Sequence, residues 1–154
     1  MPSIPLSIII RHPKERLSKC SLTPLQNHPN ITFYTAKPNF SFDATNHILL
    51  AVDAPPLSPQ DQPYPLLLLD STWKLLPDLE KSIHGTPIRR SLPLPPGLTT
   101  AYPRVSKIFK DPACGLASIE ALYLALRILG HDDPSLLDHY YWKSNFLARV
   151  NSLL

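Results

Sequence analysis

Two short stretches of the chain are apolar at every position: ILLAV at residues 48–52 and LLLL at residues 66–69. A strand with one face in water alternates apolar and polar residues, whereas a strand covered on both faces is apolar throughout. Strands of the second kind lie in the middle of parallel sheets, whose faces are covered by helices. The two stretches therefore predict two central strands of a parallel sheet.

Two further strands and three helices are expected around them. Residues 6–10 (LSIII) and 31–35 (ITFYT) are rich in β-branched and aromatic side chains, as strands are. A short helix is predicted within residues 73–84, with Pro77 in its first turn. The clearest helix is predicted at residues 118–129, which carry an apolar stripe at helical spacing.

The predicted helices have recognisable ends. Gly130 is well placed as the residue that follows the second helix, because glycine readily adopts the left-handed conformation found there. The last helix is expected to start at Asp133-Pro134, an N-cap followed by proline, and to run toward the end of the chain. Because strands and helices interleave, we predict a single α/β domain over residues 1–154 with a mostly parallel sheet.

Composition excludes several classes of protein. No apolar run approaches the ~18 residues of a membrane span. The N-terminus has neither a basic residue before its apolar run nor a small-residue cleavage site, so we expect a cytoplasmic protein. Nineteen prolines, spread between apolar segments, predict stiff loops. With four glycines there is no phosphate-binding glycine loop, and two distant cysteines with six scattered histidines predict no metal site.

Charge is distributed in blocks along the chain. Residues 1–42 hold five basic residues against Glu15 alone, and residues 84–110 hold five basic residues and no acid. An acidic block, residues 43–83, separates them. If the basic blocks meet in space they form a surface for a polyanion such as RNA, although chance clustering of solvated side chains remains the plainer alternative.

Polar groups follow the LLLL strand directly, as Asp70-Ser71-Thr72-Trp73. In parallel sheets, ligands bind beyond the carboxyl ends of the strands. The loop Cys114-Gly115-Leu116-Ala117-Ser118 leads into a predicted helix and offers backbone N–H groups to a ligand. The alternatives are structural: Asp70 as a helix N-cap and Trp73 as core filling.

Several motifs together resemble a known superfamily. Asp70-Ser71-Thr72-Trp73 resembles the D-x-T-W motif of DTW-domain proteins, and residues 102–107 with 115–121 resemble their Y-x-R-x-S and L-S-T-x-E-A segments. Residues 57–61 (LSPQD) and Lys19-Cys20-Ser21 are similar to L-S-P-x-D and K-C-S motifs of the ribosome-biogenesis aminocarboxypropyltransferases. Residues 11–15 (RHPKE) fit the H-P-x-E motif of the tRNA branch. The CxxC head of many DTW proteins is missing, and Leu22 replaces the glycine of the ribosomal motif.

The resemblance implies a SPOUT-like fold with a knotted C-terminal part that binds S-adenosylmethionine. The implied reaction transfers a 3-amino-3-carboxypropyl group to a uridine or pseudouridine of structured RNA, with small-subunit rRNA favoured over tRNA. Residues of about 1–45 would then face RNA and about 46–154 would bind the cofactor, in a monomer without metal. Alternatives are a tRNA-modifying enzyme, a non-catalytic RNA-binding ribosome-assembly factor and an RNA methyltransferase.

The implied roles fall on named residues. Asp70 and Trp73 are the expected catalytic residues: Asp70 as base or as partner of the cofactor's ammonium, and Trp73 as part of an apolar wall. Because the cofactor has three electrophilic carbons, choosing the correct one is a problem of orientation. The residues expected to bind the cofactor are Ser58, Leu69, Asp70, Tyr102, Leu116, Ala117, Ser118 and Glu120. The residues expected to bind RNA are Arg11, Lys14, Arg16, Lys19, Arg89, Arg90, Arg104 and Lys107.

Overall fold

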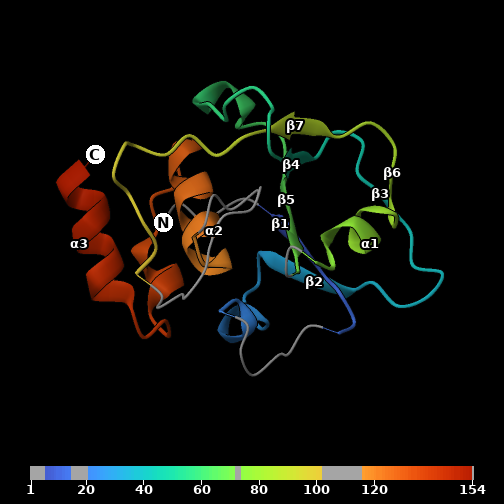
Figure 1. The fold of residues 1–154 in the computed structure, drawn as a ribbon, viewed down its shortest axis with the longest axis horizontal. Helices are drawn as coiled ribbons and strands as arrows, with labels where there is room; N and C mark the ends of the chain where they lie inside the picture. Colours follow the sequence, from blue (N-terminus) through green and yellow to red (C-terminus); the bar gives the residue numbers. More distant parts are fainter. Residues whose placement is uncertain (1–5, 15–20, 72–73, 102–115, 154) are drawn as a thin grey trace.

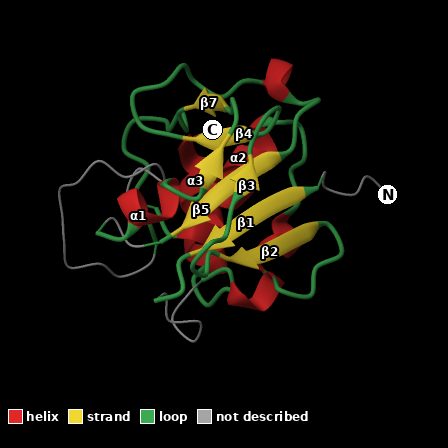
Figure 2. Ribbon diagram, turned by 90° about the vertical axis from the view of Figure 1, so that its right-hand side faces the viewer, coloured by secondary structure: helices red, strands yellow, loops and turns green. Residues whose placement is uncertain are grey.

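The structure, a computed structural model, describes residues 6–14, 21–71, 74–101 and 116–153. Five parallel strands form one sheet in the order β2-β1-β5-β4-β7 (Figure 2). A separate parallel pair joins β3 and β6. The strands are β1 (Ser7–Arg11), β2 (Ile31–Thr35), β3 (Phe42–Asp43), β4 (Ile48–Leu50), β5 (Leu66–Asp70), β6 (Ile83–His84) and β7 (Ile88–Arg90).

Helices and short 3₁₀ turns complete the described part of the chain. In Figure 1, α2 and α3 lie on one side of the sheet, while α1 and the β3-β6 pair lie on the other. The α/β fold with a mostly parallel sheet is confirmed. The helices are α1 (Leu76–Glu80), α2 (Ser118–Ile128) and α3 (Lys143–Leu153), and the 3₁₀ turns are η2 (Thr23–Leu25), η3 (Pro59–Asp61) and η4 (Pro134–Leu137).

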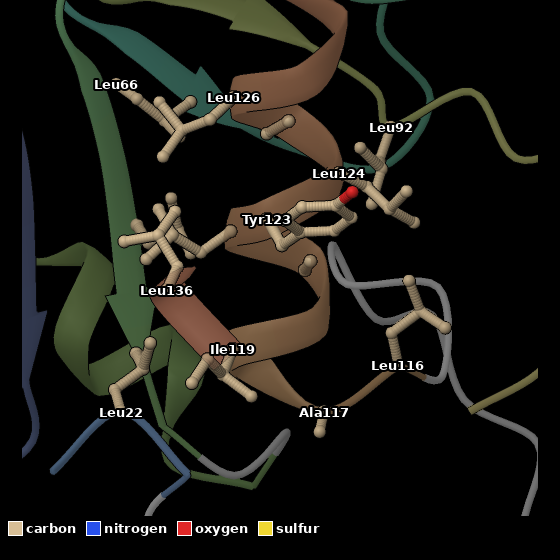
Figure 3. Packing of buried hydrophobic residues seen from close by; sticks show 14 of the residues in the cluster. Leu22, Leu66, Leu92, Leu116, Ala117, Ile119, Tyr123, Leu124, Leu126 and Leu136 are labelled. Carbon is tan, nitrogen blue, oxygen red and sulfur yellow. The ribbon is translucent and has the colours of Figure 1, made fainter. Parts of the chain in front are cut away.

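Central strands bury both of their faces, as their composition predicts. Along β5, Leu66 and Leu68 belong to a large core under α2, and Leu67 belongs to a smaller core on the opposite face. Figure 3 shows Leu126 of α2 beside Leu66 of β5, with Ile119 and Leu136 nearer the carboxyl end of the strand. Alternate side chains of a strand point to opposite faces, so a strand with no water on either side must be apolar throughout.

The predicted second helix is confirmed, including its end. Gly130 has a φ of 96°, and its N–H donates to the carbonyl of Arg127 at 3.0 Å. The N–H of His131 donates to the carbonyl of Leu126 at 2.8 Å. These two bonds form a Schellman motif, which satisfies the last carbonyls of α2.

The prediction of one continuous last helix is wrong. Asp133 does act as a cap, accepting from the N–H of Ser135 at 3.1 Å, but it caps the short turn η4, and α3 starts only at Lys143. Asp138 and His139 rank low as helix formers. Asp138 instead accepts a hydrogen bond from the Lys143 ammonium, which ties the end of η4 to the start of α3.

Strand β7 and the short pair β3-β6 were not expected from the sequence. Residues 88–90 (IRR) lack the apolar pattern of the central strands because β7 is an edge strand. Among the described residues, no helix is long and apolar enough to cross a membrane.

A buried phenol in α2 makes stability depend on pH. Burial, with a hydrogen bond from the Tyr123 hydroxyl to Asp132 at 2.6 Å, raises the pKa of Tyr123 to about 12. Because an unfolded tyrosine ionises near pH ~10, the folded state holds a proton that the unfolded chain releases, and stability falls as pH rises from about 10 to about 12.

We therefore expect Tyr123→Phe to be less stable than wild type at neutral pH, by about 1 kcal/mol for the lost hydrogen bond. The difference should shrink above pH ~10, because the variant lacks this ionisation. Urea unfolding of both proteins across the alkaline range measures it. If the free energies of unfolding of the two proteins change with pH in the same way, ionisation of Tyr123 does not cause the loss of stability.

Candidate functional site

The sheet has a topological switch point between β1 and β5. From β1 the chain continues to β2 on one side, and from β5 it continues through α1 toward β7 on the other side. Where connections diverge from adjacent parallel strands, a crevice opens beyond their carboxyl ends, and ligands bind there. Arg11 and Asp70, the last residues of β1 and β5, are register partners at this point.

A buried ion pair lies at the switch point. Arg11 Nε is 3.1 Å from Asp70 Oδ2, and the two residues are 2% and 4% exposed. Asp70 Oδ1 accepts a hydrogen bond from Ser118 Oγ at 3.3 Å, so the carboxylate also contacts the first turn of α2. The expected catalytic carboxylate therefore joins β1, β5 and α2 through its two oxygens.

The Arg11 guanidinium is enclosed by the protein. Its Nη2 donates to Thr23 Oγ1 at 3.1 Å, and its central carbon lies 4.6 Å from the centre of the Phe33 ring. A guanidinium over an aromatic face gains a cation–π contribution. We expected Arg11 on the RNA-facing surface; the structure places it in the interior, beside Asp70.

His12 is a further buried group at this edge. Its backbone N–H donates to the carbonyl of Asp70 at 3.3 Å, and its Nε2 lies 2.7 Å from Asp78 Oδ2. Because His12 Nδ1 accepts from the N–H of Lys14 at 3.1 Å, the ring proton is on Nε2 and is donated to Asp78. That hydrogen bond lowers the pKa of Asp78. His12 falls within the RHPKE motif, but we predicted no role for it.

The N-terminus of α2 is attached to its surroundings by Glu120. Glu120 is fully buried; its Oε1 accepts from Thr100 Oγ1 at 2.5 Å and from the Ala117 N–H at 2.8 Å. Its Oε2 accepts from the Ala101 N–H and the Tyr140 hydroxyl, each at 3.0 Å. We expected Glu120 to contact the cofactor; the structure places its carboxylate among four protein donors.

Leu116, Ala117 and Ser118 lie together at the switch point. Leu116 and Ala117 are buried in the large core, and Ser118 is half-buried against Asp70. The N–H of Ile119 donates to Ser21 Oγ at 3.1 Å, which connects α2 to the segment after β1. The three residues expected to surround the cofactor thus form one continuous segment beside Asp70.

The LSPQD motif forms a closed turn next to β7. Asp61 Oδ2 accepts from the Ser58 N–H at 3.1 Å, and Arg90 Nε lies 3.1 Å from the same oxygen. Arg90, which we expected to bind RNA phosphate, is therefore ion-paired with this turn. Ser58 is half-buried at its start.

The remaining expected residues fall into three groups. Leu69 packs against the smaller core, on the face of the sheet opposite Asp70. Lys14 and Arg89 are exposed. The others lie outside the described residues: Arg16, Lys19, Trp73, Tyr102, Arg104 and Lys107. Within the described ranges, no group of three or more His, Cys, Asp or Glu residues is arranged to hold a metal ion.

The fold is that of an α/β protein with a parallel sheet, whose switch point is the position where such sheets bind ligands. No protein-family model matches the chain, and no curated protein matches it in sequence. Among solved structures it is similar to the SAM-dependent rRNA:acp-transferase Tsr3 from Vulcanisaeta distributa, with 28% sequence identity and a TM-score of 0.72. The similarity covers 97% of this chain and 80% of that one.

Proposed function

We propose that this protein uses S-adenosylmethionine to transfer a 3-amino-3-carboxypropyl group to a uridine or pseudouridine of small-subunit ribosomal RNA. The observation that carries the proposal is the similarity to an S-adenosylmethionine-dependent rRNA aminocarboxypropyltransferase over nearly the whole chain. The sequence motifs support it independently, since those of their residues that the structure describes at Arg11, Asp70 and Ser118 lie together at one edge of the sheet. The rRNA named for that neighbour favours rRNA over tRNA as the substrate.

We further propose that the chain belongs to the superfamily of the DTW-domain proteins and the ribosome-biogenesis aminocarboxypropyltransferases, on the ribosomal branch. Its knotted SPOUT-like topology, its division at about residue 45, and a monomeric, metal-free state remain predictions. A location with the ribosomal RNA, in cytoplasm or nucleus, follows from the proposed substrate.

We assign the cofactor to the crevice beside Asp70. The cofactor supplies an electrophilic carbon on sulfur, and the protein has to orient it. Leu116 and Ala117 are buried apolar residues directly before Ser118, whose hydroxyl contacts Asp70. An apolar surrounding with few polar groups suits a nucleoside cofactor. In this assignment Asp70 and Arg11 are positioning residues, because both carboxylate oxygens contact protein donors.

The expected result is direct binding of S-adenosylmethionine to purified, cofactor-free protein in calorimetry. Incubation with small-subunit rRNA should then add the mass of an aminocarboxypropyl group to one nucleoside, measured by nucleoside mass spectrometry. A methyl mass instead would indicate a methyltransferase. RNA binding without cofactor binding would indicate a non-catalytic assembly factor.

Ser118→Ala tests the position of the site. Loss of the hydrogen bond to Asp70 should loosen the first turn of α2 and weaken cofactor binding by roughly 2- to 10-fold, the equivalent of about 0.5–1.5 kcal/mol. Ser135→Ala is the matched control, because Ser135 donates to Asp133 at the start of η4, away from the crevice. Equal affinities in both variants and wild type would contradict the assignment.

A further inference from the structure

An aromatic cluster on the other face of the sheet has no role in the site described so far. Tyr34 of β2 lies with its ring centre 5.9 Å from that of Phe40 and 6.0 Å from that of Phe42. Phe40 and Phe42 pack against the smaller core, whereas Tyr34 is 40% exposed. The two phenylalanines thus hold a tyrosine whose remaining surface is open to solvent.

The segment that carries this cluster is built to be rigid. The N–H of Phe40 donates to the carbonyl of Lys37 at 2.9 Å, which closes a four-residue turn. Pro38 occupies its second position and Asn39, with a φ of 71°, its third, the signature of a type II turn. Phe40 is therefore fixed against Tyr34 before any ligand arrives. A preorganised ring loses little conformational freedom on binding.

Tyr34 lies at the same sheet edge as the proposed cofactor crevice. Thr35, the next residue, is the register partner of Arg11, which in turn pairs with Asp70. The N–H of Ala36 donates to the carbonyl of Arg11 at 2.8 Å, so the segments after β1 and β2 leave the sheet together. Two strand spacings, about 10 Å, separate the backbones of β2 and β5 at this edge. Tyr34 and Asp70 point to opposite faces of the sheet, so a single strand that passes over this edge would contact both faces.

Charge around the cluster favours a polyanion. Lys14 follows β1 and Lys37 follows β2, both are exposed, and neither takes part in an ion pair formed by the described residues. Two carboxylates on this face, Asp43 and Asp78, accept hydrogen bonds from neighbouring residues. Asp43 Oδ1 accepts from the N–H and the hydroxyl of Thr45, and Asp78 Oδ2 accepts from His12.

We propose that Tyr34 is a stacking platform for an unpaired base of the substrate RNA, with Lys14 and Lys37 contacting the adjoining phosphates. The inference rests on the proposed function and adds a requirement to it: the RNA next to the modified nucleotide is single-stranded. Every base has a π-face, so such a platform binds without strong sequence preference.

The test is fluorescence anisotropy with a labelled single-stranded RNA of about 10 nucleotides. Domains that bind single strands contact ~4–16 nucleotides, so this length is sufficient. Tyr34→Leu keeps apolar volume but removes the aromatic face, and should weaken binding by roughly tenfold, equivalent to about 1.4 kcal/mol. Tyr34→Phe should bind like wild type. Tyr141→Ala is the matched control, because Tyr141 is 85% exposed beside Trp142 at the start of α3.

Salt dependence separates the lysines from the ring. Lys37→Ala should reduce the slope of log K against log salt by about 0.7, the value for one phosphate of a single strand, whereas Tyr34→Leu should leave the slope unchanged. A blunt RNA duplex should respond little to Tyr34→Leu, since its bases are already stacked.

Three outcomes would overturn the platform. They are wild-type affinity of Tyr34→Leu for the single strand, an equal loss in Tyr34→Phe and Tyr34→Leu, and no binding of the single strand by wild type. Calorimetry with S-adenosylmethionine on the same variants keeps this failure distinct from failure of the proposed function. Cofactor binding that persists in Tyr34→Leu leaves the transferase proposal standing, whatever the RNA measurements give.

Discussion

Replacing Asp70 with alanine is expected to destabilise the protein by about 3–5 kcal/mol, the usual cost of removing one partner of a buried ion pair. The cost arises because Arg11, only 2% exposed, would keep its charge without the carboxylate at 3.1 Å. Chemical denaturation, fitted with a common slope, measures the change. Asp138→Ala is the control: its pair with Lys143 is solvent-accessible, so the loss should not exceed about 1 kcal/mol.

A double-mutant cycle separates the ion pair from other effects of truncation. Arg11→Met with Asp70→Leu replaces both charges by apolar groups, which is often neutral in buried pairs. The double variant should therefore be more stable than the sum of its single changes predicts. Additive changes, or an Asp70→Ala variant within about 1 kcal/mol of wild type, would contradict a coupled buried pair.

The same pair gives the proposed site its rigidity. Through its two oxygens Asp70 links the end of β1 to the start of α2, so these two segments are held at a fixed separation. A cofactor with several electrophilic carbons needs such fixed geometry, because a displacement of about 1 Å can cost a hundredfold in rate. If the pair has this role, cofactor binding should weaken in Asp70→Asn even under conditions where that variant is fully folded.

Much of the fold could be predicted from local sequence. The strands β2 and β5 begin and end within one residue of their predicted positions. Short runs that are apolar throughout or rich in β-branched residues mostly form strands in a chain of this length. Helix α2 was predictable for a similar reason, since its apolar stripe and Gly130 agree. Strand β7 was not, because an edge strand with two arginines resembles an ordinary basic loop.

The pairing at the switch point could not be predicted from local sequence. Arg11 and Asp70 are 59 residues apart, and only the register of two parallel strands brings them together. In the sequence, Arg11 belongs to a basic block with lysines, and we expected all of these side chains on the surface. The structure instead buries Arg11 against Asp70. The same limit applies to Arg90 of β7, whose partner Asp61 lies in η3, 29 residues away along the chain.

Tyr34 had no sequence signal as a surface residue. In ITFYT it reads as one more β-former, and its exposure depends on β2 being an edge strand. The positive φ of Asn39, in contrast, has a local cause in the sequence, because Pro38-Asn39 is a frequent turn dipeptide, although we did not predict it. The exposure of a strand residue such as Tyr34 thus depends on how the strands are ordered in the sheet, whereas a turn depends on the residues that form it.

Glu120 shows how a motif residue can be structural, and it leads to the second large prediction. Its carboxylate accepts two backbone N–H groups, Ala117 on Oε1 and Ala101 on Oε2. In Glu120→Gln, either orientation of the amide presents its NH₂ group to one of these N–H groups, and neither backbone donor can rotate away. A buried donor without an acceptor costs about 1–3 kcal/mol, and loss of the charge weakens the other bonds.

We therefore expect Glu120→Gln to lower the free energy of unfolding by about 2–4 kcal/mol. Tyr140→Phe is the matched control: it removes one hydroxyl from Oε2 at 3.0 Å and should cost about 1 kcal/mol. Hydrogen exchange adds a local readout, since Ala101 and Ala117 should lose protection in Glu120→Gln while the middle of α2 keeps it. If Glu120 instead acts mainly on the cofactor, Glu120→Gln will unfold like wild type and lose only cofactor affinity, and these two measurements distinguish the cases.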